Sequence, residues 1–585
     1  MRKLKAVGAL VLGCMLVMTL ESCTGKREVG PPKENVFRLA IRSKFTTLDP
    51  HFMTDIYSIA AAGLVVENLY DFHYLKRPRQ LEPLLADGMP TMSKDFKTFT
   101  FKIKKGIKYQ DHPCFKSTNG KGPELTAHDF AYAIHRMSSP KKASPQYSNF
   151  EGTVMGVDEY HSGKAPSIKG VRVVDSHTLE IKLAKARPRF AFTFTGPRTG
   201  PLPQDCVENL NGELTNTVVG TGAYKIVEYD PNSKLIAVKN TEYKTVNYPT
   251  VGNPGDKEKG LLEDAGKPLP FVDKVVYDVL VEDQPRWLKF MAGEHEVVRI
   301  PKDNIGTALE NGKISPELAK RGVQHVREAE ADVTTWIFNM KTPVWGEKKE
   351  LRQAFSLSID RPRLIELNYG GQAVAAQSLI DPTMYGYDAN WKNPYTTRDV
   401  KKAKELIAKA GYPDGKGLPE LEMPISASSV GRQIGEATQR FAADVGIKMK
   451  LIPMAWPELA KGLRESKWMI TGLGYGGAEP DVDGVLPHFH SRNMAPGPNV
   501  ANYKNVELDK LTDEINTMAN SPARMAKIVR VREIMAEDMP YIPGVHRIGN
   551  HLVQPWVKNY VYVDEQAFGE WMKYMRVVPA TAEKK

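Results

Sequence analysis

Cysteine is scarce in this sequence, with four in 585 residues, and none belongs to a C-x-x-C pair. Redox or zinc chemistry built on paired thiols therefore has little support. The common catalytic signatures are missing too: there is no G-x-S-x-G nucleophile elbow, no H-E-x-x-H zinc motif and no G-x-x-x-x-G-K-[ST] phosphate loop. These absences favour a binding protein over an enzyme, with no cofactor, no metal and no catalytic residues.

Long apolar runs and internal repeats are also lacking. After the first twenty-two residues no stretch approaches the roughly eighteen apolar residues of a membrane-spanning helix. No period of about twenty to fifty residues recurs, which argues against a repeat solenoid. The net charge of +11 is spread along the chain and not gathered in a block. Such a distribution is typical of a solvated basic surface, although it also suits lipid headgroups, and we expect no nucleic-acid partner.

The N-terminus carries an export signal. A basic start, MRKLK, precedes an apolar-to-small run at residues 6–20, which is too short for a membrane anchor but suits a secretory signal. The run ends in Leu20-Glu21-Ser22-Cys23, which resembles the bacterial lipoprotein box and predicts lipidation of Cys23. A plain signal peptide cut near Ser22, or an uncleaved anchor, are the alternatives. We assign residues 1–22 to the signal and 23–35 to a tether.

Two of the four cysteines, Cys114 and Cys206, remain outside the leader and the lipid site. In an exported chain they can form a disulfide, while two free buried thiols fit the sequence equally well.

Strand and helix patterns alternate along the chain, which predicts a mixed α/β fold. Residues 98–104 and 178–183 alternate with period two, as half-buried strands do, and residues 223–229 and 235–238 form a predicted hairpin. Helices are predicted from Thr126 to about Arg136, from Val400 to Gly411 and from Arg432 to Val445. His488 and His490 are two residues apart, but no further metal ligands are evident nearby, so an ordinary loop is the better interpretation.

Several blocks, in chain order, resemble the family 5 extracellular solute-binding proteins of bacterial ABC importers. They are residues 48–51 (LDPH), 66–70 (VENLY), 81–86 (LEPLLA), 99–109 (FTFKIKKGIKY), 125–132 (LTAHDFAY), 220–224 (GTGAY), Asn339, 351–355 (LRQAF), 359–361 (IDR) and 410–413 (AGYP). Residues 144–147 (SPQY), 158–164 (DEYHSGK) and 170–171 (GV) resemble the oligopeptide-binding branch in particular.

The resemblance implies a two-lobed periplasmic-binding-protein fold, of the Venus flytrap type, with an extra α+β domain packed on the first lobe. Lobe I then comprises residues 36–66, 168–278 and 545–585, the extra domain 67–167, and lobe II 279–544, with crossings near residues 277–282 and 542–547. The implied function is a lipid-anchored, monomeric substrate-binding protein outside the cytoplasm, in the periplasm or at the cell surface. It captures oligopeptides by hinge closure and delivers them to an ABC permease.

Ligand-binding residues are implied by the same resemblance. The aromatic residues in segments that face the cleft in the family are Tyr70, Tyr147, Trp336, Trp456 and Tyr475. Packing in the hydrophobic core is the alternative for each of them.

One position departs from the family pattern. Peptide binders of the family usually carry an aspartate that holds the ligand's α-ammonium, and here that position falls on Gly476, or on 477–478 with a different gap. An unpaired buried ammonium is costly. The ligand therefore lacks a free N-terminus, or Glu479, Asp481 or a carboxylate of residues 464–467 takes the aspartate's place.

Three other functions stay open. A receptor of the same fold can bind a non-peptide solute such as a metal chelate, an opine or a saccharide. An exported hydrolase would need a convergent acid, base or nucleophile, and the sequence offers none. A signalling or chaperone-like surface protein can use the fold without transport.

Overall fold

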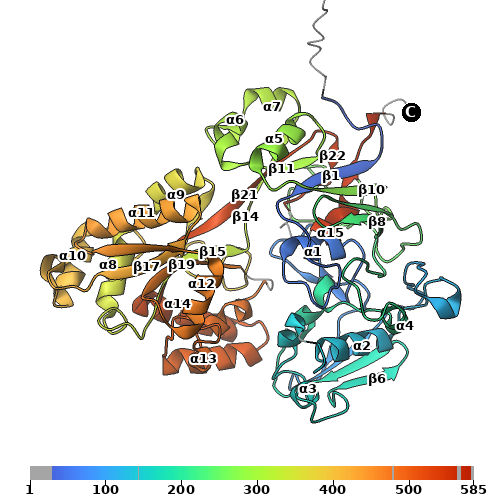
Figure 1. The fold of residues 1–585 in the computed structure, drawn as a ribbon, viewed down its shortest axis with the longest axis horizontal. Helices are drawn as coiled ribbons and strands as arrows, with labels where there is room; N and C mark the ends of the chain where they lie inside the picture. Colours follow the sequence, from blue (N-terminus) through green and yellow to red (C-terminus); the bar gives the residue numbers. More distant parts are fainter. Residues whose placement is uncertain (1–28, 143, 477–479, 563–567, 581–585) are drawn as a thin grey trace, which may run out of the picture.

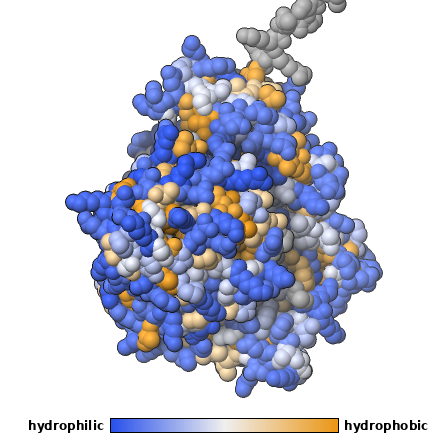
Figure 2. Space-filling view, turned by 60° about the vertical axis from the view of Figure 1, so that its left-hand side comes forward, coloured by the Kyte–Doolittle hydropathy of each residue, from blue (hydrophilic) through white to orange (hydrophobic). Residues whose placement is uncertain are grey.

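The computed structural model describes residues 29–142, 144–476, 480–562 and 568–580. The chain folds into two lobes of mixed helix and strand, and long strand β21 runs from one towards the other (Figure 1). The face seen in Figure 2 is mostly hydrophilic, with small separate apolar patches, as expected from 25% charged residues. No helix among the described residues combines the length and apolar character needed to cross a bilayer.

The first lobe is built on a four-stranded sheet in the order β1-β10-β9-β8. Strand β1 pairs in parallel with β10, and the other pairs are antiparallel. Its elements are β1 (Val36–Ile41), α1 (Ile56–Ala62), β2 (Tyr70–Phe72), β3 (Leu81–Pro83), β8 (Tyr224–Asp230), β9 (Lys234–Lys239), β10 (Lys274–Val279), β22 (Val557–Lys558), α15 (Phe568–Trp571) and β23 (Arg576–Val577). Segments from both ends of the chain share one core, so the lobe closes only when the C-terminus returns.

The extra domain packs below this lobe in Figure 1 around a second sheet, in the order β4-β5-β7-β6. Its core is rich in phenylalanine, with Phe99, Phe101, Phe190 and Phe194 in mutual ring contact. Its elements are β4 (Thr91–Met92), β5 (Thr98–Lys102), α2 (Ala127–Met137), α3 (Val157–His161), β6 (Val171–Asp175), β7 (Thr178–Lys182) and α4 (Gln204–Asn209). The last three lie beyond residue 167, where the resemblance implied that the domain ends, because β6 and β7 complete its sheet.

A disulfide joins Cys114 to Cys206 in this domain, with their Cα atoms 4.8 Å apart. Of the two alternatives left by the sequence, the structure has the bonded one. The bond ties helix α4 to a segment 92 residues earlier in the chain. His112 lies close to both sulfurs, but the disulfide uses them, so this group is not a free set of metal ligands.

Residues 279–329, which the resemblance assigns to lobe II, build a layer of their own at the hinge. Strands β11 and β14 flank β21, and the short helices pack on them around Trp287 and Phe290. The elements are α5 (Asp283–Met291), β11 (Val297–Arg299), α6 (Ile305–Ala308), β12 (Leu309–Glu310), β13 (Lys313–Ile314), α7 (Pro316–Lys320), β14 (Gln324–Ala329) and β21 (Val545–Val553). The cores of the second lobe begin only at Val333, so β14 and β21 carry the chain between the lobes.

The second lobe has a three-stranded sheet in the order β19-β15-β20 and a parallel pair, β17 and β18. Helices cover both, and two buried clusters fill the interior. The elements are β15 (Asp332–Phe338), α8 (Lys349–Ser358), α9 (Arg361–Tyr369), β16 (Ala373–Ala375), α10 (Val400–Lys409), β17 (Leu421–Ser426), α11 (Ser429–Ala443), β18 (Met449–Met454), α12 (Trp456–Glu465), β19 (Ile470–Gly476), α13 (Val506–Thr517), α14 (Pro522–Asp538) and β20 (Tyr541–Pro543).

The structure confirms three local predictions from the sequence: a hairpin, a helix cap and the end of a helix. Strands β8 and β9 form the predicted hairpin, with a bulge between Ile226 and Glu228. Helix α2 begins at the predicted capping box, where the Thr126 N–H donates to the Asp129 carboxylate at 2.7 Å. Helix α10 is followed by Gly411 at a φ of +97°, a conformation that favours glycine.

Candidate functional site

Strand β19 presents a row of glycines along one face. In its antiparallel pairing with β15, Gly472 lies opposite Trp336, Gly474 opposite Thr334, and Gly476 opposite Asp332. Residues directly opposite each other in such a pair share one face of the sheet, so the missing side chains leave space above the β15 residues. A Cβ added to Gly474 would have no atom within 4 Å, which shows how open this face is.

A cavity of about 210 Å³ occupies this space, below helices α9 and α11. Its lining is mainly apolar and includes Trp336, Met423, Ile425, Ile434 and Leu364. We call it the apolar pocket. Gly431, Gly435, Gly472 and Gly474 also line it, so its volume depends on residues that lack a side chain.

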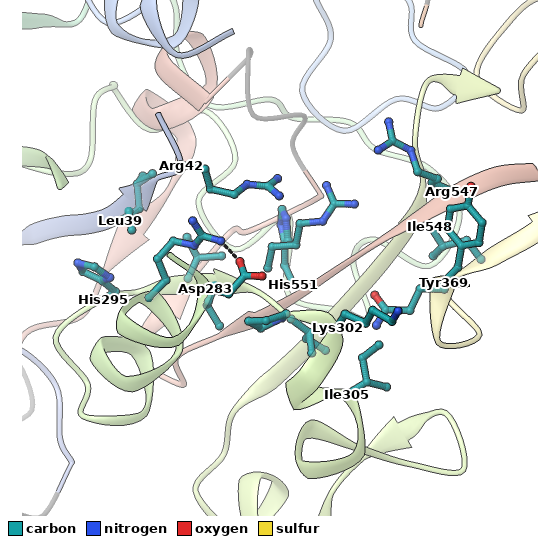
Figure 3. A pocket seen from close by; sticks show the side chains of 18 of the residues that line it. Leu39, Arg42, Asp283, His295, Lys302, Ile305, Tyr369, Arg547, Ile548 and His551 are labelled. Carbon is teal, nitrogen blue, oxygen red and sulfur yellow. Dashed lines mark hydrogen bonds and ion pairs between the residues drawn. The ribbon is translucent and has the colours of Figure 1, made fainter. Parts of the chain in front are cut away.

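A second cavity, of about 250 Å³, lies at the hinge between the end of β1, strand β11, helix α9 and strand β21 (Figure 3). We call it the basic pocket, because five cationic side chains line it against one carboxylate. The cations are Arg42, Arg286, Arg299, Lys302 and Arg547, and the carboxylate is Asp283. Figure 3 shows Arg42, which follows β1, and Arg547, from β21, on different sides of this space.

Some of these cations have carboxylate partners. Arg286 pairs with Asp283, Arg299 with Glu330, and Arg547 with Asp332 and, at 3.4 Å, with Glu330. The Lys302 Nζ donates to the Gln433 side chain at 3.2 Å. Three of the five cations, Arg286, Arg299 and Arg547, therefore have carboxylate partners at the hinge.

Tyr369, the last residue of α9, lines both cavities. Burial raises the pKa of its hydroxyl, so the ring stays neutral and able to donate a hydrogen bond. The basic and apolar pockets thus meet at one side chain.

The extra domain also contacts the second lobe directly. Arg189, just before the helical turn Phe190–Phe194, donates to Asp483 at 2.5 Å and to the carbonyl oxygens of Met518 at 2.7 Å and Ile515 at 3.2 Å. Two of these acceptors lie at the C-terminal end of α13, where helix carbonyls lack intrahelical partners. The side chain is buried, so it holds the lobes at a defined separation.

Two of the predicted aromatic residues pack on the core of the extra domain: Tyr70 from strand β2 of the first lobe, and Tyr147 from the domain itself. Tyr70 has no exposed surface and packs on Phe101, so the prediction that it faces the cleft is wrong and the core alternative holds. Tyr147 donates to Asp158 at 2.6 Å and stacks on His161 at 3.8 Å between ring centroids. These contacts tie its ring to α3.

The two tryptophans differ in exposure. Trp336 is buried at the floor of the apolar pocket. Trp456 begins helix α12 with 64% of its surface exposed, which is unusual for so large an apolar side chain and leaves it available to a ligand.

Tyr475 lies on the opposite face of β19 from the glycines. Its ring contacts His488 at 4.5 Å and Tyr541 at 6.0 Å, beside the buried cluster of the second lobe. Gly476 is exposed at the end of the glycine row. The strand's alternation therefore separates these two neighbouring predicted residues.

Among the described residues, the carboxylates considered as replacements for the aspartate are already paired. Asp481 is 2% exposed and holds Arg524 through contacts of 2.5 and 2.9 Å, so the prediction that it replaces the missing aspartate is wrong. Asp332, opposite Gly476, is held by Arg547. Glu465 pairs with Lys467 at 2.8 Å on the surface. Glu479 and Cys23 lie outside the described residues.

Sequence reasoning missed the basic pocket and Tyr369. The five cations lie at positions between 42 and 547, with no spacing in common. Only the return of β21 beside β11 and β14 brings them to one place.

Comparison with known proteins gives a consistent set of similarities. The profile of "Bacterial extracellular solute-binding proteins, family 5 Middle" matches residues 80–496, more than half of the chain. The chain is 24% identical to heme-binding protein A of Haemophilus influenzae over 567 residues, covering 95% of each chain. It is 24% identical to the oligopeptide-binding protein OppA of Bacillus subtilis, covering 93% of this chain and 94% of the relative.

Among solved structures, the chain is similar to the periplasmic binding protein DppA of Helicobacter pylori in complex with the peptide STSA. The TM-score is 0.69 at 22% identity, covering 93% of this chain and 98% of that one. This likeness establishes the two-lobed fold of periplasmic binding proteins.

Proposed function

We propose that this chain, which belongs to the bacterial extracellular solute-binding proteins of family 5 and is the substrate-binding protein of an ABC importer, captures oligopeptides and delivers them to the permease. It does so as a monomer held to the membrane by a lipid on Cys23. Its relatives are solute-binding proteins and not enzymes.

The observation that carries the peptide proposal is the glycine row of β19. Strand β19 is the outer strand of its sheet, so one row of its backbone N–H and C=O groups points away from β15. An extended peptide can add to such an edge through main-chain hydrogen bonds that are independent of its sequence. The glycines at 472, 474 and 476 leave one face of the sheet open beside this edge, which gives room for the side chains of an added peptide.

One observation favours a second candidate, a receptor for a non-peptide solute. The position at which peptide binders of the family usually place an aspartate is Gly476, and the neighbouring Asp332 and Asp481 are committed to arginines. A peptide held here is therefore not anchored through a free α-ammonium by these groups.

A peptide library in free and N-acetylated forms tests the proposal by thermal shift and calorimetry. A ligand that binds only the folded state stabilises it by about 2.7 kcal/mol at a hundredfold excess over the Kd. We expect similar affinities for free and acetylated peptides. A response to a sugar, an opine or a metal chelate, with none to any peptide, would refute the oligopeptide assignment.

The lipid anchor has its own test. Replacing Cys23 with Ser removes the proposed attachment point for the lipid, and we expect the protein to move from the membrane fraction into solution. Acyl chains in combination anchor firmly, so the shift should be nearly complete. Equal membrane association of the variant and the native protein would disprove lipidation at Cys23.

A further inference from the structure

We propose that a lysine-lined groove between the extra domain and the first lobe binds anionic phospholipid headgroups and so orients the receptor on the membrane that holds it. This rests on the membrane attachment given in the proposed function. It adds a second membrane contact, separate from the lipid on Cys23 and from the solute.

The groove has a volume of about 1480 Å³ and lies chiefly between residues 102–111 of the extra domain and residues 221–245 of the first lobe. We call it the lysine groove. Pockets for drug-sized solutes measure about 300–1,000 Å³, so the lysine groove has more room than one small solute needs. It suits charged groups that are presented on a larger surface.

Cations outnumber carboxylates along the lysine groove. Seven lysines line it against four carboxylates, which are those of Asp87, Asp111, Asp175 and Glu242. Lys121 pairs with Asp111 at 2.8 Å, and the Lys104 Nζ donates to a backbone carbonyl oxygen at 2.7 Å. The other five form no ion pair with any residue that the structure describes: Lys102, Lys105, Lys108, Lys225 and Lys244. The excess of positive charge attracts an anionic surface.

Both walls of the lysine groove belong to one half of the molecule, and buried contacts hold them together. The Gln110 backbone N–H donates to the Gly220 carbonyl oxygen at 3.0 Å, and its side chain donates to the Tyr224 carbonyl oxygen at 2.6 Å. Tyr243, which also lines the groove, donates to the buried Glu67 carboxylate at 2.6 Å. The spacing of the lysines is therefore independent of the hinge, and we expect lipid binding to be the same with and without solute.

The first sheet places the lysine groove near the point where the chain enters the fold. Val36, the first residue of β1, pairs with Lys274 of β10. Val238 of β9 pairs with Lys274 on one side and with Lys225 of β8 on the other. Val36 and Lys225 thus stand in one row across four strands, about 14 Å apart at the usual strand spacing.

The tether keeps this end of the sheet close to the membrane. Thirteen residues, 23–35, span at most about 45 Å when fully extended. A membrane attached at Cys23 therefore stays within reach of the lysine groove. Because the two are linked, a contact that is weak between free partners acts at a high effective concentration.

Vesicle sedimentation of the full chain carrying Cys23→Ser tests the inference without the lipid. The vesicles contain phosphatidylcholine alone, or phosphatidylcholine and phosphatidylglycerol in a ratio of about three to one. We expect binding to the mixed vesicles and not to the neutral ones. Binding should fall as the salt concentration rises, because salt screens the attraction between exposed charges.

A triple variant removes charge from both walls of the lysine groove. It combines Lys105→Gln, Lys108→Gln and Lys244→Gln, all at exposed positions. We expect its affinity for the mixed vesicles to fall by about a hundredfold, from the loss of three lysines near an anionic surface.

A matched control removes the same charge from the second lobe. It combines Lys401→Gln, Lys404→Gln and Lys416→Gln, which are exposed and do not line the lysine groove. We expect its affinity for the mixed vesicles to stay within about threefold of the parent's. The melting temperature of each variant verifies folding.

Three outcomes would overturn the inference. The first is equal binding of the parent and the groove variant to mixed vesicles, and the second is equal binding of the parent to neutral and mixed vesicles. The third is binding of poly-glutamate through the three groove lysines with no binding to mixed vesicles, which would place an acidic protein segment in the lysine groove.

Failure of the proposed function gives different results. Cell fractionation at high salt screens the lysine groove, so Cys23→Ser that still stays with the membrane there would refute the lipid anchor and leave the vesicle result standing. The peptide proposal is decided by calorimetry, which the groove variant should leave unchanged.

Discussion

At the scale of single residues, buried carboxylates make this protein sensitive to pH. Glu296 has no exposed surface, and one oxygen accepts the Arg38 backbone N–H. Burial raises the pKa of Glu296 to about 8, against 4.5 ordinarily. The folded state therefore binds more protons than the unfolded state between these values, so this residue's contribution to stability is full below about pH 4.5 and is lost as the pH rises through 8.

The substitution Glu296→Gln keeps the shape of the side chain and removes its ionisable carboxyl group. As the pH rises from 5 to 8, we expect the native protein to lose stability relative to the variant. The loss in the free energy of unfolding is about 1.4 kcal/mol for each pH unit between the two pKa values. Urea unfolding of both proteins at pH 5, 6, 7 and 8 measures the difference. A constant difference across this range would show that Glu296 does not titrate there.

At the scale of elements, the disulfide reinforces a domain whose pieces come from distant segments. Helix α4 carries Cys206 and is also tied to Cys114 by a hydrogen bond from the Asn209 side chain to the Cys114 carbonyl, at 2.9 Å. A cross-link over 92 residues restricts the unfolded chain far more than the folded one.

Replacing both cysteines by serine should destabilise the extra domain by about 2–4 kcal/mol. Both residues are changed together so that no lone thiol remains. Urea unfolding of the oxidised native protein and of the double variant, followed by proteolysis at intermediate urea, shows whether this domain opens first. Coincident unfolding curves would mean that packing alone holds α4 in place.

At the scale of the whole molecule, two features govern how the lobes are arranged. Strands β14 and β21 connect them, and Arg189 bridges them at a distance from the hinge. Binding by hinge closure depends on the fraction of molecules in the competent arrangement, because the apparent Kd scales inversely with that fraction. Arg189 therefore lies outside both pockets but can still affect affinity.

Arg189→Ala should open the lobes, increase the radius of gyration in X-ray scattering and weaken ligand binding, with no change in ligand preference. Arg172→Ala, which removes a surface arginine of the same domain paired with Glu180, is the control and should alter neither quantity. An unchanged radius of gyration in Arg189→Ala would show that the hinge alone fixes the separation.

The sequence by itself determined the features that depend on neighbouring residues: the strand alternation of β5 and β7, the hairpin of β8 and β9, the cap of α2, and the ordered blocks that carry the family resemblance. These follow from local periodicity and turn chemistry, which a short window of residues contains.

Only the tertiary structure decided how deeply each side chain is buried and with which charge it pairs. Tyr70 is core, Asp481 is neutralised by Arg524, and cations from position 42 to position 547 meet at the hinge. An alternating pattern of apolar and polar residues predicts on which face of a sheet a side chain lies. It does not predict which other segments of the chain pack on that face. Pairing and desolvation arise from contacts between segments hundreds of residues apart, so the basic pocket exists only in the folded chain.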